Sequence, residues 1–508
     1  MDSPGVGSSG VHQLLPDAPV EDGAVRAALG LQRLLQASGI PSEIFAAHDP
    51  GPFNAVVREY AERARWSHPG DTLLTHGAPI DRAPDRTTHW PGPVIAAPDL
   101  PPLFTPAELA RNAKAAREAL AGVGIQAKER GALSIALVST SARSGLQTYA
   151  HAFATALRAN GHQVEHIAVA WRDSGELLSR LRKIPRSCDL VIIEHEFGLF
   201  RDAALIAGLA ILRARGLRVL LSLHELEPDK FRDYVAVYIG AQYRQRGGCL
   251  FELLRIPYAV LRTARFMLTY RLTLTALGWL PDLLVVHSDK AYDNVGLITS
   301  DRSKVDVVPH FVEPLEGMPP VDTVREAAGR HALRRELDLP EEGVVVTSPG
   351  FLFKRKRLRE VAVATPKDMT LVIAGTGVAW EEDYPSTIRA FIEQHGLRNV
   401  ILDESYERMP RHLLAADAVV LYYKDIFQSG IASHAIWAEK PLVLSDIPSF
   451  RMYEGAALYA DDEADLTARL EEIKDPAVRD RLAAGARQLK ELLTPEAMAL
   501  RYLVRARR

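Results

Sequence analysis

Six short apolar runs alternate with helix-length amphipathic runs between residues 344 and 462, and this pattern restricts the possible folds most. The runs are VVVTSPGF (344–351), TLVIAG (370–375), NVILDES (399–405), AVVLYY (418–423), PLVLSD (441–446) and ALYA (457–460). Strands that are apolar throughout and separated by helices are typical of a parallel sheet covered on both faces. The pattern predicts a doubly wound α/β domain, which binds its ligands at the carboxyl ends of the strands.

Four segments of this region follow one another in a characteristic order: GFLFKRKRL (350–358), LVIAGTG (371–377), AADAVVLYY (415–423) and QSGIASHAIWAEKPLVLSD (428–446). In this order they resemble the C-terminal domain of the retaining GT-B glycosyltransferases of family-4 type (glycosyltransferase group 1). Upstream, CDLVIIEHEFG (188–198), LLSLHEL (220–226), LLVVHS (283–288) and VDVVPHFVEP (305–314) resemble that family's N-terminal domain. The resemblance implies an α/β chain of GT-B architecture, with two Rossmann-like doubly wound domains facing a cleft.

Length and composition are those of an ordinary globular chain. The 508 residues suffice for three domains with separate cores, and the net charge of −3 argues against nucleic acid as a partner. The two cysteines, Cys188 and Cys249, cannot form a disulfide framework and indicate a reducing compartment. Neither a signal peptide nor an apolar run of about 18 residues is recognisable, so we expect a cytoplasmic protein without a transmembrane helix.

The first 92 residues show the same succession of elements as the region after residue 132. Gly23 and Gly39 enclose an amphipathic helix pattern, as do Gly145 and Gly161. Two strand-like runs follow in each region: SEIFAA (42–47) and GDTLLTHG (70–77), and QVEHIAVA (163–170) and CDLVIIEHEFG (188–198). We interpret residues 1–92 as an α/β lobe that is a partial repeat of the N-terminal domain. The alternative is that two unrelated βαβ units share this pattern.

The predicted domain organisation has five parts. They are an N-terminal α/β lobe (1–92), a linker and helix (93–131), the N-terminal acceptor domain (132–325), the C-terminal donor domain (326–490) and a C-terminal helix (491–508). Residues 78–106 are rich in proline and polar residues, which is typical of a linker. The helix is expected over residues 105–124, with Thr105 as N-cap and Glu108 three residues later.

Two turns are predicted to present helix N-terminal amides to the donor phosphates. Ser144 and Gly145 follow the strand-like run LSIALVST, and in the resembled family this turn lies beside the donor diphosphate. Gln428, Ser429 and Gly430 precede the helical run IASHAIWAEK. Bare amides at a helix N-terminus attract anions, and glycine lets a phosphate approach the backbone. The alternative is that the glycines serve the turns alone.

His195, which ends the run VIIEH, is the first candidate catalytic residue. The resembled family carries a His-Glu pair here, and the pair in this chain is His195 and Glu196. The resemblance implies that His195 forms a hydrogen bond with the transferred sugar and does not abstract a proton. Glu196 and His224, which follows the next strand-like run, are candidate acceptor or sugar contacts. The alternative is that the histidines are structural.

Lys356, in GFLFKRKRL, is the second candidate catalytic residue. In the resembled family an arginine and a lysine of this segment neutralise the diphosphate leaving group. Gly350 and Lys356 match the family pattern, whereas Phe351 stands in the place of the arginine and Arg357 in the place of a second glycine. The alternative is a solvated basic turn.

Other residues are candidates for the remaining donor contacts. Lys354 and Arg355 are candidates for the missing charge, since departure of a nucleoside diphosphate requires electrostatic stabilisation. Glu404 belongs to a loop that borders the nucleobase in the resembled family, as do residues 375–377.

Two glutamates that the family carries before Lys440 are replaced by Ile426 and His434. Asp425 is the candidate substitute for the first.

Residues 228–281 form an insert predicted to be helical, with eight Lys and Arg, three Asp and Glu, and frequent aromatic residues. Basic aromatic helices lie on anionic membrane surfaces. Three interpretations remain open. The apolar faces pack on the domain core, the insert shapes the acceptor site, or it makes a peripheral contact with the inner membrane face.

The resemblance implies a retaining, metal-independent glycosyltransferase of hexosyltransferase type. Its co-substrate would be a UDP- or GDP-linked sugar, with no further cofactor, and its acceptor a glycan, a lipid-linked glycan or another glycoconjugate. Because Phe351, Ile426 and His434 replace functional residues of the family, the alternative is an inactive GT-B pseudoenzyme that acts as a binding or regulatory partner. The sequence leaves the oligomeric state open.

Overall fold

The computed structural model describes fifteen stretches of the chain, with most of the gaps in the first 130 residues and between residues 226 and 268. They are residues 11–15, 22–38, 40, 42, 44–46, 57–59, 72–75, 94–96, 106–122, 131–142, 145–226, 268–378, 381, 383–426 and 428–503. The chain forms two compact units, one of residues 132–308 and one of the residues before 132 and after 308.

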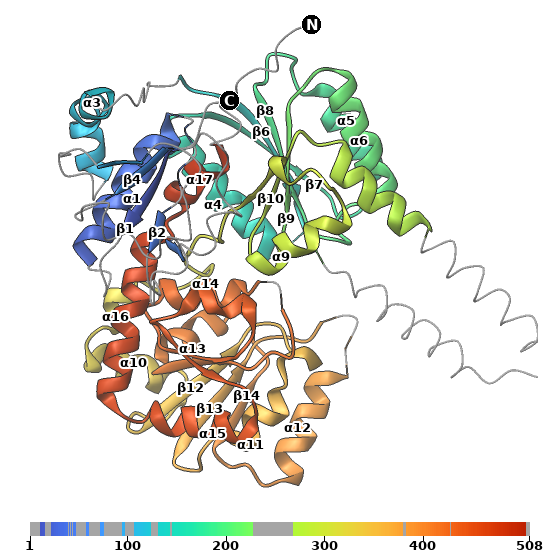
Figure 1. Ribbon diagram of the computed structural model, residues 1–508. Coiled ribbons are helices and arrows are strands. Elements are labelled where there is room, and N and C mark those ends of the chain that lie inside the picture. The colour runs from blue at the N-terminus through green and yellow to red at the C-terminus, as the bar shows by residue number, and fades with distance from the viewer. Residues whose placement is uncertain are drawn as a thin grey trace, which may run out of the picture. The chain divides into compact units, whose positions relative to one another are not determined.

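The unit of residues 132–308 is built on a parallel six-stranded sheet with the order β11-β10-β9-β8-β6-β7 (Figure 1). Its strands are β6 (Ser134–Thr140), β7 (Gln163–Val169), β8 (Leu190–His195), β9 (Val219–Leu223), β10 (Leu283–Val286) and β11 (Val305–Val307). Its helices include α4 (Gly145–Ala159), α5 (Ser174–Lys183), α6 (Asp202–Ala214) and α9 (Asp289–Asn294). Strands β8 and β9 are buried along their whole length. The sheet grows in opposite directions from β6, so its switch point lies between β6 and β8.

The sheet of the C-terminal residues is also parallel and six-stranded, with the order β14-β13-β12-β15-β16-β17. Its strands are β12 (Val344–Pro349), β13 (Met369–Ala374), β14 (Val400–Asp403), β15 (Ala418–Leu421), β16 (Leu442–Ser445) and β17 (Ala457–Ala460). All six strands expected from the apolar runs are therefore confirmed. The order reverses at β12, so the switch point of this sheet lies between β12 and β15.

Helices and short 3-10 turns connect these six strands. They are α10 (Ala327–Glu336), η7 (Lys354–Lys356), α11 (Leu358–Ala364), α12 (Tyr384–Gln394), α13 (Met409–Ala415), α14 (Gly430–Trp437), η8 (Pro448–Tyr453), α15 (Glu463–Glu472), α16 (Pro476–Leu492) and α17 (Pro495–Leu503). Leu352, Leu358 and Leu466 are fully buried in the core against the sheet. Burial of one such side chain stabilises the fold by about 1.5–3 kcal/mol, so these residues fix the chain that follows β12.

The N-terminal lobe contains a third parallel sheet, with the order β3-β2-β1-β4-β5. Its elements are β1 (Val11–Leu15), α1 (Asp22–Ala37), β2 (Ile44–Ala46), β3 (Val57–Glu59), β4 (Thr72–Thr75) and β5 (Val94–Ala96), and α3 (Pro106–Gly122) follows. The order β2-β1-β4-β5 repeats the order β7-β6-β8-β9, as expected for a partial repeat. A common origin of the two stretches stays a prediction.

Strand β5 corrects the expectation that residues 78–106 form only a linker. Its three apolar residues lie between Pro93 and Pro98 and pair with β4. An edge strand tolerates such flanking prolines because one of its sides needs no ladder hydrogen bonds. Helix α3 confirms the helix expected over residues 105–124, while its proposed N-cap, Thr105, lies outside the described residues.

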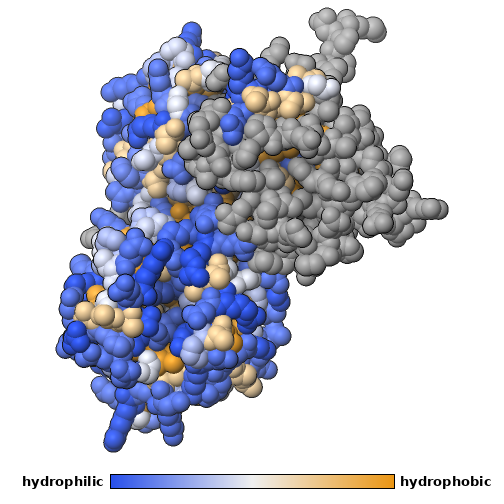
Figure 2. All heavy atoms as spheres, turned by 90° about the vertical axis from the view of Figure 1, so that its left-hand side faces the viewer, coloured by the Kyte–Doolittle hydropathy of each residue, from blue (hydrophilic) through white to orange (hydrophobic). Residues whose placement is uncertain are grey.

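Most of the predicted helical insert lies outside the described residues. Its described end, residues 268–279, is helical and exposes three large apolar side chains, Leu268, Leu272 and Trp279. In the space-filling view the coloured residues are mostly hydrophilic, with apolar residues in small separate groups (Figure 2). Among the described residues, no helix has both the length and the hydropathy needed to cross a bilayer.

Candidate functional site

A turn at the carboxyl end of β12 brings Lys356 back to the strand end. Gly350 follows the strand with a φ of +103°, a conformation that glycine adopts without steric cost. A Cβ atom at Gly350 would lie 2.9 Å from both Lys356 Nζ and Ile431 Cγ1. The missing side chain of Gly350 therefore lets the amine and the first turn of α14 approach the same point of the backbone.

The amine of Lys356 is buried, and the side chain is only 2% exposed. Its Nζ donates a hydrogen bond to the Pro349 carbonyl and lies 5.8 Å and 5.9 Å from the ring centroids of Phe353 and Tyr423. Burial lowers the pKa of Lys356 to about 7. A cation held in such surroundings gains strongly from a nearby anion, which restores the protonated form.

The N-terminus of α14 lies beside the same aromatic ring. Ser429 is the N-cap, and its Oγ accepts a hydrogen bond from the Ala432 amide at 3.2 Å. Tyr423 is buried, which raises the pKa of its hydroxyl, and that hydroxyl forms a hydrogen bond with Ser429. Tyr423 thus contacts both the lysine and the helix cap. The structure brings together Lys356, Ser429 and Gly430, three of the residues predicted from the sequence, at the switch point between β12 and β15.

The neighbouring basic residues are arranged differently. Lys354 is exposed, and its amide donates to a Glu381 carboxylate oxygen at 2.8 Å. Arg355 is partly buried, and its carbonyl accepts a hydrogen bond from the Lys424 amide. Arg357 stands where a glycine was expected, and its φ of +50° shows that this position does adopt the left-handed conformation.

The positions of the absent family residues are filled by other contacts. Phe351 is 40% exposed and stacks on Tyr406, with ring centroids 5.8 Å apart. His434 is buried, and its Nδ1 donates to the Glu313 carbonyl at 2.9 Å. Ile426 accepts a hydrogen bond from Ser449 through its carbonyl. The side chain of His434 thus forms a hydrogen bond with the backbone of Glu313. Asp425 and Gln428, the remaining candidates of this segment, are both partly buried.

A hollow of about 340 Å³ lies at the carboxyl ends of β13 and β14. It is lined by Thr376, Gly377, Val378, Pro385, Ser386, Arg389 and Glu404. Glu404, predicted to bind the donor, pairs with Arg389 of α12 at its wall. The hollow therefore offers a paired carboxylate, a guanidinium and a hydroxyl next to the glycine-rich turn of residues 375–377.

In the unit of residues 132–308, the predicted site residues divide into buried and accessible ones. Gly145 is exposed at the first position of α4, while Ser144 lies outside the described residues. His195 is fully buried, with its ring centroid 5.1 Å from Phe197 and 6.0 Å from Phe200. Glu196 is partly exposed. A ring so enclosed among phenylalanines favours the structural interpretation of His195.

Glu194, which precedes His195 in β8, belongs to a buried polar network that was not predicted from the sequence. His224 Nε2 lies 2.7 Å from a Glu194 carboxylate oxygen, and Ser222 Oγ lies 3.1 Å from His287 Nε2. His287 Nδ1 lies 2.8 Å from the Val308 carbonyl. Burial lowers the pKa of both His224 and His287 to about 3, and raises the pKa of Glu194 to about 7.

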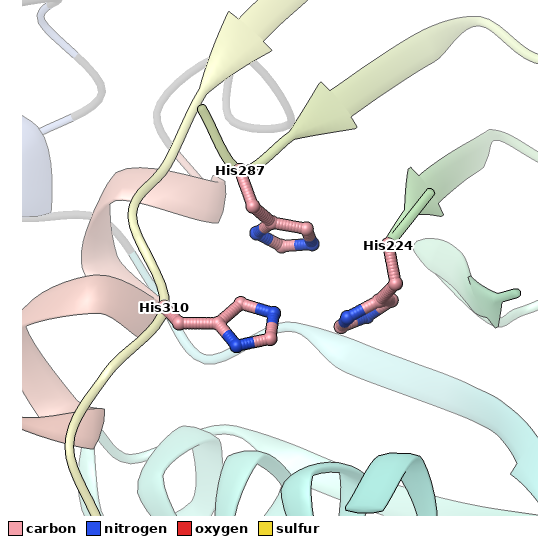
Figure 3. A group of neighbouring side chains, drawn as sticks. All are labelled: His224, His287 and His310. Atoms are coloured by element: carbon pink, nitrogen blue, oxygen red, sulfur yellow. The ribbon is translucent and has the colours of Figure 1, made fainter. Parts of the chain in front are cut away.

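The imidazoles of this network converge at the strand ends. His224 and His287 directly follow β9 and β10, and His310 follows β11 (Figure 3). The ring centroids of His224 and His287 lie 4.3 Å apart. A signal was present in the sequence, because SLHEL and VVHS place a histidine at the end of consecutive parallel strands. Of these two histidines, only His224 is among the predicted site residues.

No protein-family model and no curated protein matches the chain. Solved structures do match it. Anabaena Alr3699/HepE in complex with UDP and glucose has a TM-score of 0.52 at 13% identity, covering 73% of this chain and 97% of that chain. Sucrose-phosphate synthase from Thermosynechococcus elongatus has a TM-score of 0.50 at 16% identity, with coverage of 73% and 97%. A glycosyltransferase from Rickettsia africae has a TM-score of 0.52 at 10% identity, with coverage of 74% and 97%.

These similarities concern the fold. The neighbours are GT-B glycosyltransferases, and the two parallel six-stranded sheets of this chain match theirs. The chain therefore has the GT-B fold, as the sequence predicted. HepE was also solved with UDP-glucose, again with a TM-score of 0.52.

Proposed function

We propose that the protein is a glycosyltransferase that takes a sugar from a nucleotide-diphosphate donor. The observation that carries the proposal is the buried amine of Lys356 beside the N-cap of α14, at the switch point of a parallel sheet. Open α/β sheets bind ligands at such points, and a cation next to bare helix amides is suited to phosphate. The structures with similar folds that contain UDP or UDP-glucose support the same class of ligand.

In the proposed mechanism, Lys356 and the amides of the α14 N-terminus hold the donor diphosphate. Their charge stabilises the nucleoside diphosphate as its bond to the sugar breaks, which replaces the role of a metal in this step. The leaving phosphate and the incoming hydroxyl share one face of the sugar, so configuration is retained and the phosphate oxygen receives the hydroxyl proton. We assign the base to the hollow near Glu404 and Arg389, and leave UDP and GDP as the two candidate nucleotides.

The remaining assignments are parts of the same proposal. The acceptor is a glycan, a lipid-linked glycan or another glycoconjugate. The domain that receives it is the predicted acceptor domain of residues 132–325. The exposed Leu268, Leu272 and Trp279 support a peripheral membrane contact of the insert, because apolar side chains at the end of a basic segment favour an anionic bilayer surface. The pseudoenzyme alternative is less consistent with a lysine kept buried at an energetic cost.

Isothermal titration of the full chain with UDP, GDP and their sugars tests the proposal. We expect binding of one nucleotide that weakens at least tenfold in Lys356→Met. The matched control is Lys440→Met, because Lys440 is also buried but donates to the carbonyls of Leu414 and Ala416. Lack of heat with every nucleotide at millimolar concentration would contradict the proposal, and so would an equal loss of affinity in both variants.

A further inference from the structure

Phe351 and Tyr406 form a stacked aromatic pair at the carboxyl ends of strands in the C-terminal sheet. Phe351 follows β12 and Tyr406 follows β14, and their ring centroids lie 5.8 Å apart with 27° between the ring planes. The side chain of Phe351 is 40% exposed, although phenylalanine is usually buried. Open α/β sheets bind their ligands at this edge. The pair therefore offers a flat aromatic surface on the side of the sheet where a ligand is expected.

The backbone on both sides of Phe351 is held in place. The amide of Gly350 donates to the Ala374 carbonyl at 2.9 Å, and the amide of Leu352 donates to the Thr376 carbonyl at 2.8 Å. The side chain of Leu352 is fully buried in the core. An aromatic ring on such an ordered segment needs little further ordering when a ligand stacks on it, which favours binding.

The turn that carries Tyr406 is also held by hydrogen bonds. The Asp403 carboxylate accepts one from the Ser405 amide at 3.0 Å, and Ser405 Oγ accepts one from the Arg408 amide at 3.2 Å. The carbonyl of Tyr406 accepts a hydrogen bond from the Met409 amide at 3.3 Å. The hydrogen bonds of the two turns thus preorganise both halves of the aromatic pair.

Phe351 is flanked in the chain by residues that contact the two parts of the proposed nucleotide site. A Cβ atom at Gly350 would lie 2.9 Å from Lys356 Nζ, the amine proposed to hold the diphosphate. Leu352 forms a parallel bridge with Gly377, which lines the hollow of about 340 Å³ proposed to hold the base. The exposed ring therefore lies next to both the diphosphate contacts and the base hollow.

A nucleobase requires two kinds of contact that are present here. Its flat faces stack on aromatic rings, and its polar edge forms hydrogen bonds. The hollow offers the side chains of Ser386, Arg389 and Glu404 for the edge, and Glu404 lies two residues before Tyr406. The exposed ring of Phe351 offers the partner for a face.

We propose that the ring of Phe351, supported by Tyr406, stacks on the nucleobase of the donor. This inference rests on the proposed function and adds to it a side chain that acts on the base, whereas Lys356 acts on the diphosphate. The competing explanation is that the pair only covers the strand ends. In that case the ring has no effect on nucleotide affinity as long as the fold is intact.

Isothermal titration of the full chain with UDP, GDP and inorganic pyrophosphate tests the proposal, because pyrophosphate has no base. We expect Phe351→Ala to weaken binding of the preferred nucleotide by about 5–150-fold, as for the loss of one base–aromatic stack, and to leave pyrophosphate affinity unchanged. Phe351→Trp should retain nucleotide affinity, and Phe351→Leu should lose it. The matched control is Phe391→Ala, which removes a half-buried ring that packs against His395 in α12 and should leave both affinities unchanged.

The outcomes separate this inference from the proposed function. Unchanged nucleotide affinity in folded Phe351→Ala would refute the stack and leave the transferase proposal intact. Equal losses of nucleotide and pyrophosphate affinity would also refute it, because they would indicate a disturbed turn beside Lys356. Both proposals fail if the wild-type chain binds no nucleotide.

Tryptophan fluorescence of Phe351→Trp gives a second readout. We expect the bound nucleotide to quench its emission beyond the quenching measured for the wild type, because the base would lie against the new indole. Absence of additional quenching in a variant that still binds the nucleotide would contradict the stack.

Discussion

Replacement of Lys356 by methionine should stabilise the protein and at the same time weaken nucleotide binding. The amine has a pKa of about 7 in the folded chain and 10.5 in its ordinary state. One pKa unit corresponds to about 1.4 kcal/mol, so the buried charge costs at most roughly 5 kcal/mol below pH 7. Methionine fills much of the same volume without a charge, but it leaves the Pro349 carbonyl without its donor, which costs about 1–3 kcal/mol. We expect a net gain of about 1–3 kcal/mol at pH 6.

The pH dependence of this gain follows from the direction of the pKa change. Between pH 7 and pH 10.5 the unfolded chain binds a proton at Lys356 that the folded chain lacks, so wild-type stability rises with pH in this window. Below pH 7 both states carry the proton and the folded state bears the full cost. The advantage of Lys356→Met should therefore be largest at pH 6 and shrink by pH 9.

Differential scanning fluorimetry of wild type and variant at pH 6 and pH 9 measures this difference. Lys440→Met is the control for nucleotide affinity, because the Lys440 amine donates to the carbonyls of Leu414 and Ala416. Burial also lowers the pKa of Lys440 to about 7, so the stability of this variant should follow the same pH trend, with a smaller gain because two hydrogen bonds are lost. The reasoning would be refuted if Lys356→Met lowered the unfolding temperature equally at pH 6 and pH 9, or if nucleotide affinity stayed unchanged.

Further variants examine the turn, the base hollow and the buried histidine. Gly350→Ala should cost about 1–3 kcal/mol of stability and weaken nucleotide binding at least tenfold, because the new Cβ would lie 2.9 Å from Lys356 Nζ. The control is Gly343→Ala, where φ is +83° and the surrounding space is open, so only stability should change. Thermal melts and nucleotide titrations measure the two effects. Glu404→Ala should change the preference between UDP and GDP in competition titrations, and an unaltered preference would remove Glu404 from the base site. His195→Phe should retain the fold by circular dichroism and leave turnover unchanged, because the ring lies among phenylalanines. A loss of turnover without loss of nucleotide affinity would contradict this structural interpretation and support the sugar contact that the resemblance implies.

The sequence was sufficient to predict the sheets because their signal is local. The runs from residue 344 to 462 are mostly apolar, as is typical of strands in a parallel sheet covered on both faces, and β12 to β17 coincide with them. Strand β5 was not predicted, because three apolar residues between prolines show no hydrophobic periodicity. The order of the strands in each sheet cannot be predicted from local sequence patterns, because it depends on which strands pair with one another.

The site was only partly predictable for the same reason. Gly350, Lys356 and Ser429 are recognisable as parts of separate turns, but the convergence of Lys356 and Ser429 on Tyr423 depends on the pairing of β12 with β15. In β8, the alternation of side chains places Glu194 and His195 on opposite faces, and the sequence alone did not indicate which face carries the polar network. The role of His287 emerged only from its neighbours on β9.

Donor hydrolysis in the absence of acceptor tests the central claim most directly. Purified protein is incubated with UDP-glucose, with other UDP-sugars and with GDP-sugars, and the released nucleoside diphosphate is measured over time. The proposed function predicts slow release from one donor, a loss of at least tenfold in Lys356→Met, and retention of the activity in folded Lys440→Met. Absence of release from every donor, together with absence of nucleotide binding by the wild-type chain, would contradict it.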